Sequence, residues 1–346
     1  MSNKAKDIII PQESGIFRIV FLYVGQGDST LLVLPFGEEY KYMLIDCNQN
    51  NLFGGVDLPI LLKDLTDTLH YFVNTHPHKD HISGIKRIAS AVNIEEIWHS
   101  GHIPGGEHKD MFKEFEEVMK SLGEDHVVKL EGTRNEDLQV GDVLYNVLSP
   151  AEYVSDDIQD EKPEDRYKRI HEQCAVLRFR YGEDEKQIMI TGDADLDAWK
   201  KHITEYHKDR LSSTVLSASH HGSRSFFKKD EKDEPYEDHL EAMSASYLII
   251  SAPKQEESEH DHPHDDALEI YGEYFNEDSI FHLGKNRECV IVDIRKDGSI
   301  DVKLDKELVE EYGIEDNGKD GKNQQSTEKK PPLVVISDSP RKAWSV

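Results

Sequence analysis

A cluster of three histidines and one aspartate within six residues constrains this chain more than any other feature of its sequence. The cluster, residues 76–81 (HPHKDH), follows the apolar run 69–74 and precedes residues 82–92, whose apolar positions recur at helical spacing. Imidazole nitrogens and carboxylate oxygens are ligands that zinc takes in proteins, and a catalytic zinc site leaves one position for water. The sequence therefore predicts a metal site between a buried strand and a helix.

The spacing within the cluster divides it between two ions. On a non-helical loop, His76 and His78 can point to the same side and bind one ion. Asp80 and His81, one turn later, can face a second ion, and we also assign Asp80 as a catalytic residue. The alternative is a solvated polar loop in which the aspartate caps the following helix.

Further ligands must come from elsewhere in the chain, and two places offer them. Asp193 follows the apolar strand 187–191, where an unpaired carboxylate would be costly to bury, so we expect it to bridge two cations. The alternative for Asp193 is a helix cap. His220 and His221 follow the strand 213–217. One of this pair is expected to bind the second ion: we assign His220 as the ligand and His221 as a catalytic proton donor.

Strands and helices interleave along the chain. Residues 16–24, 30–34 and 40–46 read as an antiparallel meander, because they are rich in β-branched and aromatic residues and are joined by short turns that contain glycine. Residues 289–294 and 300–304 read as two late strands that close the fold. The predicted class is α/β, with sheets that are at least partly antiparallel.

The chain is strongly acidic. Its 346 residues include 41 Lys and Arg against 69 Asp and Glu, a formal charge of −28. This excess argues against a protein that coats DNA without regard to sequence, because such binding needs a positive surface. We expect residues 1–310 to form one domain in which the charged stretches 155–166, 228–238 and 255–266 are loop insertions, and residues 311–346 to be a disordered tail. These acidic loops and the tail could recruit a protein partner.

The three cysteines, Cys47, Cys174 and Cys289, are too few for a disulfide framework, which favours a reducing compartment. We read Cys47 and Cys174 as core residues. There is neither an apolar signal-peptide region nor a run of about 18 apolar residues, so we expect a cytoplasmic protein with no membrane span.

Taken together, the motifs resemble the metallo-β-lactamase-fold hydrolase domain of the ComEC competence-protein family. The resemblance runs in order from about residue 16 to about residue 304. It is carried by residues 24–29 (VGQGDS), 44–46 (LID), 76–81 (HPHKDH), 191–193 (TGD), 220–223 (HHGS) and 262–264 (HPH).

The resemblance implies an αββα sandwich, with two mixed sheets flanked by helices and the metal site at the edge of the sheets. It also implies two metal ions, with zinc expected and manganese or iron as alternatives. The chain departs from the family at Tyr23, where relatives often have aspartate, and at residues 171–174 (HEQC), where they often have Asn and Ser. In the wider superfamily a histidine near this place completes the first metal site, so His171 is a candidate ligand.

The implied reaction is hydrolysis by a metal-bound hydroxide, which needs no serine or cysteine nucleophile. We favour a phosphodiesterase or nuclease, whose substrate is a phosphodiester such as single-stranded nucleic acid. A hydrolase of a small ester, lactone or thioester on the same fold is the first alternative. The second is a metal-binding interaction protein without catalysis.

Candidate substrate contacts lie near the metal motifs. We assign Ser223 and Arg224 to substrate binding, and His264 to protonation of the leaving group. Ordinary surface charge is the alternative for Arg224 and for the other basic residues near these motifs, which are Lys79, Lys228, Lys229 and Lys254. The alternative for His264 is a histidine of the acidic loop without a catalytic role.

Overall fold

The structure is a computed structural model, and it describes residues 4–49, 54–104, 109–133 and 136–314. Within these residues the strands form two sheets. The first has eight strands in the order β15-β14-β1-β2-β3-β4-β5-β6, and the second has seven in the order β13-β12-β11-β10-β9-β8-β7. The strands of the first sheet are β1 (Ile16–Phe21), β2 (Thr30–Phe36), β3 (Glu39–Ile45), β4 (Thr68–Asn74), β5 (Asn93–His99), β6 (Val127–Lys129), β14 (Cys289–Arg295) and β15 (Ile300–Asp305). Those of the second are β7 (Leu138–Val140), β8 (Val143–Ser149), β9 (Val176–Tyr181), β10 (Lys186–Ile190), β11 (Val215–Ser217), β12 (Tyr247–Ile250) and β13 (Ile280–His282).

Both sheets are mixed, as predicted. Strands β1, β2 and β3 form the predicted antiparallel meander, and β14 returns from the end of the chain to pair antiparallel with β1. In the first sheet, β15 pairs antiparallel with β14, whereas β3 to β6 run parallel to one another. Strands β10 to β13 of the second sheet also run parallel. Parallel strands bring their carboxyl ends to one edge of a sheet. The loops after β4, β10 and β11 therefore meet, and these loops carry the histidine and aspartate motifs.

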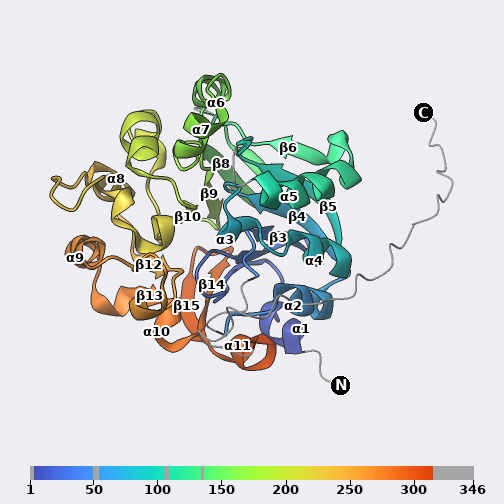
Figure 1. Ribbon diagram of the computed structural model, residues 1–346. Coiled ribbons are helices and arrows are strands. Elements are labelled where there is room, and N and C mark those ends of the chain that lie inside the picture. The colour runs from blue at the N-terminus through green and yellow to red at the C-terminus, as the bar shows by residue number, and fades with distance from the viewer. Residues whose placement is uncertain (1–3, 50–53, 105–108, 134–135, 315–346) are drawn as a thin grey trace.

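Helices cover the outer faces of the two sheets. Figure 1 shows α2, α4 and α5 on one side of the sandwich and α8 and α9 on the other. No helix in the described residues is both long and apolar enough to cross a membrane. The α-helices are α1 (Lys4–Ile9), α2 (Leu58–Leu65), α3 (Lys79–Ile82), α4 (Ile85–Ala91), α5 (Lys109–Leu122), α6 (Glu152–Gln159), α7 (Pro163–Lys168), α8 (Asp238–Met243), α9 (Asp265–Tyr274), α10 (Leu283–Asn286) and α11 (Glu307–Tyr312). Helical turns of the 3₁₀ or π type are η2 (Glu124–His126), η3 (Ala198–Ile203), η4 (Lys208–Arg210), η5 (Ser219–Gly222), η6 (Arg224–Phe226), η7 (Gln255–Glu257) and η8 (Glu277–Ser279).

Aromatic side chains join the two sheets face to face. The ring of Phe17 on β1 lies 6.2 Å from that of Phe179 on β9, and Trp98 on β5 stacks at 5.4 Å on Tyr145 of β8. Such pairs contribute beyond the apolar area that they bury. A second apolar cluster, which includes the fully buried Trp199, packs helices on the outer face of the seven-stranded sheet. The sandwich therefore has an inner core and an outer one, and the loops at the sheet edge are held from both sides.

One charged stretch folds differently from its prediction. Residues 155–166 were expected to be a loop, but helices α6 and α7 occupy most of this stretch. The reason is that Val154 and Ile158, four residues apart, are both buried and give α6 an apolar face. At the other end, α11 runs across the predicted domain boundary at residue 310. Residues 315–346, most of the predicted tail, lie outside the described residues.

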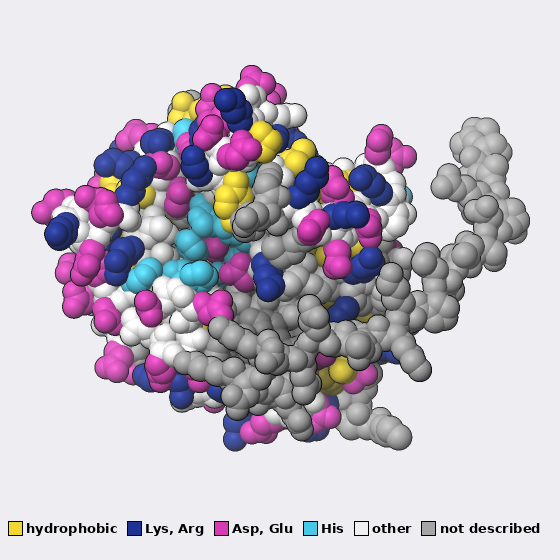
Figure 2. Space-filling model, in the orientation of Figure 1, with side chains coloured by type: hydrophobic (Ala, Val, Ile, Leu, Met, Phe, Trp, Pro, Cys, Tyr) yellow, Lys and Arg dark blue, Asp and Glu magenta, His cyan; other side chains and the backbone are white. Residues whose placement is uncertain are grey.

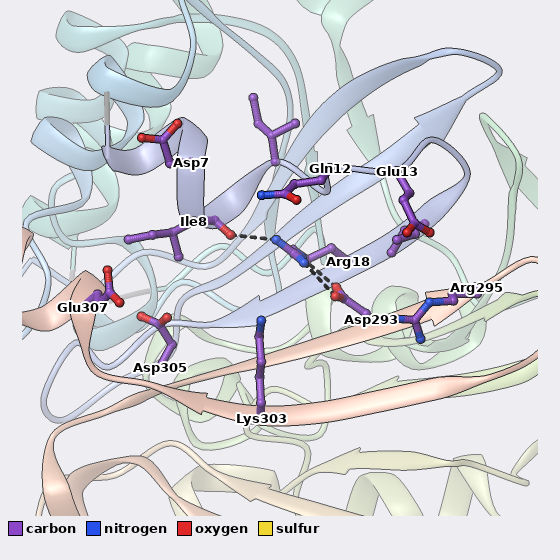
Figure 3. A pocket seen from close by; sticks show the side chains of 12 residues that line it. Asp7, Ile8, Gln12, Glu13, Arg18, Asp293, Arg295, Lys303, Asp305 and Glu307 are labelled. Carbon is purple, nitrogen blue, oxygen red and sulfur yellow. Dashed lines mark hydrogen bonds and ion pairs between the residues drawn. The ribbon is translucent and has the colours of Figure 1, made fainter. Parts of the chain in front are cut away.

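A buried ion pair joins β1 to β14. Arg18 lies opposite Asp293 in the strand register and donates two hydrogen bonds of 2.6 Å to its carboxylate. A third N–H of Arg18 reaches the carbonyl of Ile8 in α1 at 2.6 Å, so one side chain holds three elements together. Arg18 also lines a cavity of about 430 Å³, whose wall carries Glu13 and Lys303 (Figure 3).

We expect Asp293→Ala to lower the free energy of unfolding by about 3–5 kcal/mol, because Arg18 would remain buried and charged without its partner. Replacing both residues with apolar ones, Arg18→Met with Asp293→Leu, should cost clearly less. Urea unfolding of both variants measures this. The exposed pair Lys86–Glu117 is the control, since Lys86→Ala should leave stability unchanged. Equal losses in the single and double variants would contradict the role of the ion pair.

His239 lies fully buried in the outer cluster, where its Nε2 is 3.1 Å from the carbonyl oxygen of Phe226. Burial lowers the pKa of His239 to about 3. Its pKa in the unfolded chain is about 6.5, so the unfolded state binds more protons between these two values and stability falls as the pH drops below about 6.5.

Between pH 7 and pH 5 the wild type should therefore lose about 2 kcal/mol more than His239→Gln, which keeps a donor but does not titrate. Urea unfolding at the two pH values measures the difference. The exposed His126→Gln is the control and should behave like the wild type. If His239→Gln kept the full pH dependence, the buried imidazole would not be its source.

Candidate metal centre

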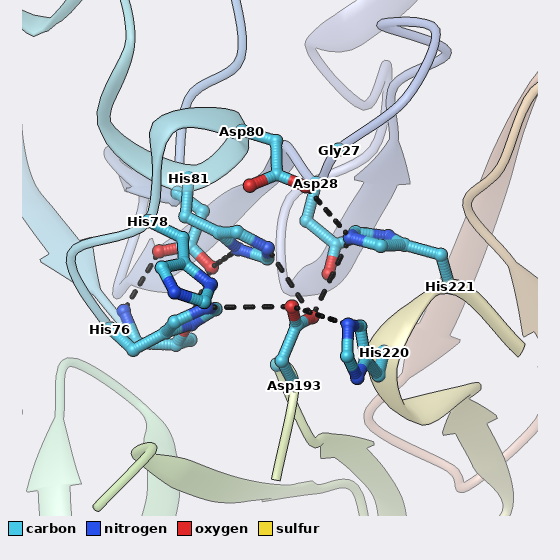
Figure 4. A network of polar contacts seen from close by, with 12 residues as sticks. Gly27, Asp28, His76, His78, Asp80, His81, Asp193, His220 and His221 are labelled. Carbon is cyan, nitrogen blue, oxygen red and sulfur yellow. Dashed lines mark hydrogen bonds and ion pairs between the residues drawn. The ribbon is translucent and has the colours of Figure 1, made fainter. Parts of the chain in front are cut away.

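The centre is built around the carboxylate of Asp193, which follows β10 and is 1% exposed. Gly192, with φ of 47°, makes the turn that brings it there. A side chain on Gly192 would meet Thr75 Oγ1 at 2.7 Å and Cys174 Sγ at 2.8 Å, so only glycine fits. Figure 4 shows imidazoles from two other loops pointing at Asp193.

A first group of possible ligands faces Oδ2 of Asp193. It consists of His76, His78, His171 and Asp193, whose candidate ligand atoms lie within 4.8 Å of one another. Nε2 of His76 is 3.4 Å from Asp193 Oδ2, and His171 Nε2 is 3.7 Å from the same oxygen and 3.1 Å from His78 Nδ1. Ligands on one tetrahedral zinc, with bonds of about 2.0–2.1 Å, stand about 3.3 Å apart. The structure thus brings His171 to the predicted pair.

A second group faces the other oxygen, Oδ1, of Asp193. It consists of Asp80, His81 and His221. Nε2 of His81 lies 3.3 Å and Nε2 of His221 lies 3.6 Å from Asp193 Oδ1, and His221 Nε2 is also 3.3 Å from Asp80 Oδ2. Asp193 therefore stands between the two groups with one oxygen turned to each.

The donor atoms of these groups fit metal ions. Nε2 of His76, His81 and His221, and Oδ1 of Asp193, are buried and make no hydrogen bond. Buried polar atoms normally have hydrogen-bond partners, so several buried atoms without a hydrogen bond at one place need an explanation. Imidazole and carboxylate donors at these spacings supply it, because they suit zinc and related transition metals. The two groups are consistent with a binuclear metal site.

The electrostatics of the centre show how strongly these groups interact. Burial disfavours the charged imidazole of His81, but the carboxylates of Asp193 and Asp46 outweigh burial and raise its pKa well above the usual value. His221 is shifted in the same direction by Asp193 and Asp28. Burial alone would raise the pKa of Asp193, yet the imidazoles around it, His81 foremost, hold it well below its usual value. Cations and protons therefore compete for the same nitrogens, since a ligating imidazole must be neutral.

Asp46 orients a histidine of the second group. Its Oδ2 lies 2.8 Å from His81 Nδ1, so this carboxylate holds the ring with Nε2 toward Asp193. Asp46 also accepts hydrogen bonds from the backbone N–H and the hydroxyl of Thr75, at 2.8 and 2.6 Å. It thereby ties the loop of residues 76–81 to the end of β3.

Two consecutive histidines adopt left-handed backbone conformations. His220 has φ of 50° and His221 has φ of 58°, a region that is costly for residues other than glycine. The turn sends His221 into the second group, with its Nδ1 2.9 Å from the carbonyl oxygen of Ser251. His220 lies outside that group: its Nε2 is 3.6 Å from Asp193 Oδ2, and its Nδ1 bonds Ser225 Oγ at 2.9 Å. The geometry thus favours the reverse of the predicted roles, with His221 as the ligand.

The predicted substrate residues are engaged within the protein. Ser223 is buried and its hydroxyl caps η6. Arg224 and Lys228 both pair with Asp266, at 3.2 and 2.9 Å. His264 lies one step away from the ligand groups, where its Nδ1 accepts a hydrogen bond of 3.1 Å from the Arg224 N–H. Their assigned roles in substrate binding and leaving-group protonation stay predictions.

Two residues near the centre escaped the sequence analysis. Asp28 lies with Oδ1 3.6 Å from His221 Nδ1 and falls in a cluster with His221 and Asp193. His262, known only as part of a motif, has its ring 5.1 Å from that of His220. Asp28 belongs to the motif 24–29 and His262 to the motif 262–264. The sequence showed these motifs, but no local pattern predicts that their loops lie beside the metal centre. Figure 2 shows histidines, with acidic side chains among them, reaching the surface in a hollow of the molecule.

Comparison with known proteins agrees with this geometry. Residues 22–198, half of the chain, match the model of the metallo-beta-lactamase superfamily, and the protein belongs to that superfamily. Its two mixed sheets with flanking helices are the fold of the family.

Among curated proteins, ComE operon protein 3 of Bacillus subtilis (strain 168) is 24% identical over 280 residues, which cover 76% of this chain and 31% of the relative. The chain thus spans about a third of the length of this relative. Among solved structures, YhfI from Bacillus subtilis is 13% identical and covers 83% of this chain and 100% of its own, with a TM-score of 0.41. CmlA, a diiron beta-hydroxylase from Streptomyces venezuelae, is 12% identical and covers 82% of this chain and 55% of its own, with a TM-score of 0.44.

The hydrogen bond that Asp46 accepts from His81 predicts an asymmetric effect on metal binding. Asp46→Asn should weaken the affinity of the second ion by about 10–100-fold and leave the first nearly unchanged, because only His81 loses its orienting carboxylate. Competition titration with a chromophoric chelator resolves the two affinities. Asp301→Asn, on the exposed face of β15, is the control. Equal losses at both ions would show that Asp46 acts on the whole loop instead.

Proposed function

We propose that this protein is a zinc-dependent hydrolase of phosphodiesters. The observation that carries the proposal is the position of Asp193, whose two oxygens face two separate groups of ligand atoms, among which Nε2 of His76, His81 and His221 is buried without a hydrogen bond. This arrangement suits a pair of cations sharing one carboxylate. Its resemblance to the hydrolase domain of the competence proteins supports the same reading. Manganese or iron would suit the same donor set.

A pair of divalent cations, held by the two groups of ligands that share Asp193, would supply positive charge to the oxygens of a phosphoryl group and would make a water molecule more acidic. The residues of the chain do the rest. Asp193 stands between the two groups, Asp80 lies beside His221 in the second group, and Asp46 fixes the ring of His81. His221 is fixed in turn by the carbonyl of Ser251. The assembly is therefore organised before substrate arrives, which avoids paying for reorganisation during the reaction.

The acid-rich surroundings favour a second candidate, a hydrolase of small esters or lactones. Asp266 neutralises Arg224 and Lys228, and Asp197 pairs with Lys229 at 2.8 Å. Three of the basic side chains nearest the metal motifs in sequence are therefore already paired. A long polyanion gains less from such a rim than a small substrate does.

The metal-loaded protein should contain one to two equivalents of transition metal and hydrolyse bis(p-nitrophenyl) phosphate, and chelation should abolish the activity. We expect Asp193→Ala to lower kcat/KM by at least about 100-fold, because both groups lose their shared oxygen donor. Asp184→Asn, on an exposed turn, is the matched control. Single-stranded DNA, RNA and p-nitrophenyl esters are assayed in parallel. Turnover of the esters alone would replace the first candidate by the second, and full activity in Asp193→Ala would contradict both.

A further inference from the structure

His262 is a buried histidine beside the metal centre to which the groups described above give no task. It lies in the loop between η7 and α9 and is 4% exposed. Its ring centroid is 5.1 Å from that of His220, 6.0 Å from that of His221 and 4.8 Å from that of His264. It therefore stands at the side of the second group, outside both sets of ligands.

The backbone around His262 is held firmly. Its N–H donates to Ser258 Oγ at 3.0 Å, and the N–H of His264 donates to the carbonyl of Gly222 at 3.1 Å. Gly222 has φ of 80°, and a side chain there would come within 2.7 Å of Pro263 Cβ. The loop thus packs directly on the turn that carries the paired histidines. Because the backbone is anchored by hydrogen bonds at His262 and at His264, the fold sets the position of the His262 ring.

The ring nitrogens of His262 make no hydrogen bond within the described residues. Nδ1 of His262 is buried and makes no hydrogen bond. The other ring nitrogen, Nε2, has no hydrogen-bond partner among the described residues either. The nearby rings differ, since His220 bonds Ser225, and His221 lies 2.9 Å from a backbone carbonyl oxygen. Leaving a buried polar group unsatisfied is unfavourable. A histidine kept in place at that cost, next to a reaction centre, points to a ligand that completes its bonding.

We propose that His262 binds substrate by donating an imidazole N–H to a non-bridging oxygen of the phosphoryl group held at the second group of ligands. The proposal rests on the proposed function and adds a contact that the metal ligands do not make. It differs from the role predicted for His264, which is to protonate the leaving group. Hydrogen bonds to a charged oxygen are worth about 1.5–3 kcal/mol, or roughly 10- to 150-fold in affinity.

The test uses inorganic phosphate as a binding probe and two diesters as substrates. His262→Phe keeps the ring volume without an N–H, and His262→Gln restores a donor. Exposed His260→Gln, on the same loop, is the matched control. We expect His262→Phe to bind phosphate at least tenfold more weakly by calorimetry, with unchanged metal content, while His262→Gln recovers most of the loss. The loss in kcat/KM should be similar for bis(p-nitrophenyl) phosphate and diphenyl phosphate.

The remaining outcomes overturn the proposal. Unchanged phosphate affinity in His262→Phe, no phosphate binding by the wild type, or a loss of metal together with affinity would each exclude a direct contact. If His262→Phe lost much more kcat/KM with diphenyl phosphate, whose phenoxide is the poorer leaving group, His262 would be a proton donor instead. If the wild type binds phosphate but hydrolyses no diester, the proposed function fails, and the phosphate titration still decides the role of His262.

Discussion

The structure depends on the cost of burying one carboxylate. Asp193 is 1% exposed at the end of an apolar strand, and its charge is tolerable only because five imidazoles surround it. This requirement explains features that are unfavourable in themselves. Gly192 turns the chain sharply to present Asp193, and two adjacent histidines accept left-handed backbone conformations to reach it. Local strain of this kind persists only where the surroundings fix it.

The sequence predicted those parts of the molecule that are encoded locally. The meander of β1, β2 and β3 was readable because β-branched runs and glycine turns are neighbours in the chain. The loop of residues 76–81 was readable because four donors lie within six positions. Asp193 could be placed by the same logic, since a carboxylate that ends a buried strand must find a compensating partner.

What the sequence could not settle depends on where distant loops meet. Whether His171 joins the first group depends on how the residues after α7 pack on the loop of residues 76–81. The spacing of motifs in the sequence does not predict this packing. Which of His220 and His221 enters the second group could not be read from the sequence, because both adopt left-handed backbone conformations that no local pattern predicts. The helices within residues 155–166 were not predicted, because the many charged residues of this stretch indicated a loop. The one apolar pair that gives α6 a buried face, Val154 and Ile158, is a weak signal beside them.

The donors of the centre come from both halves of the sandwich. His76, His78 and His81 follow a strand of the eight-stranded sheet, whereas Asp193 and His221 follow strands of the seven-stranded sheet. Cations held between them would act as a cross-link at the open edge of the two layers, in addition to any chemistry. Ligands that bind only the native state stabilise it by mass action. The metal-loaded protein should then resist proteolysis better than the metal-free protein. A chain without metal would therefore be both inactive and degraded sooner.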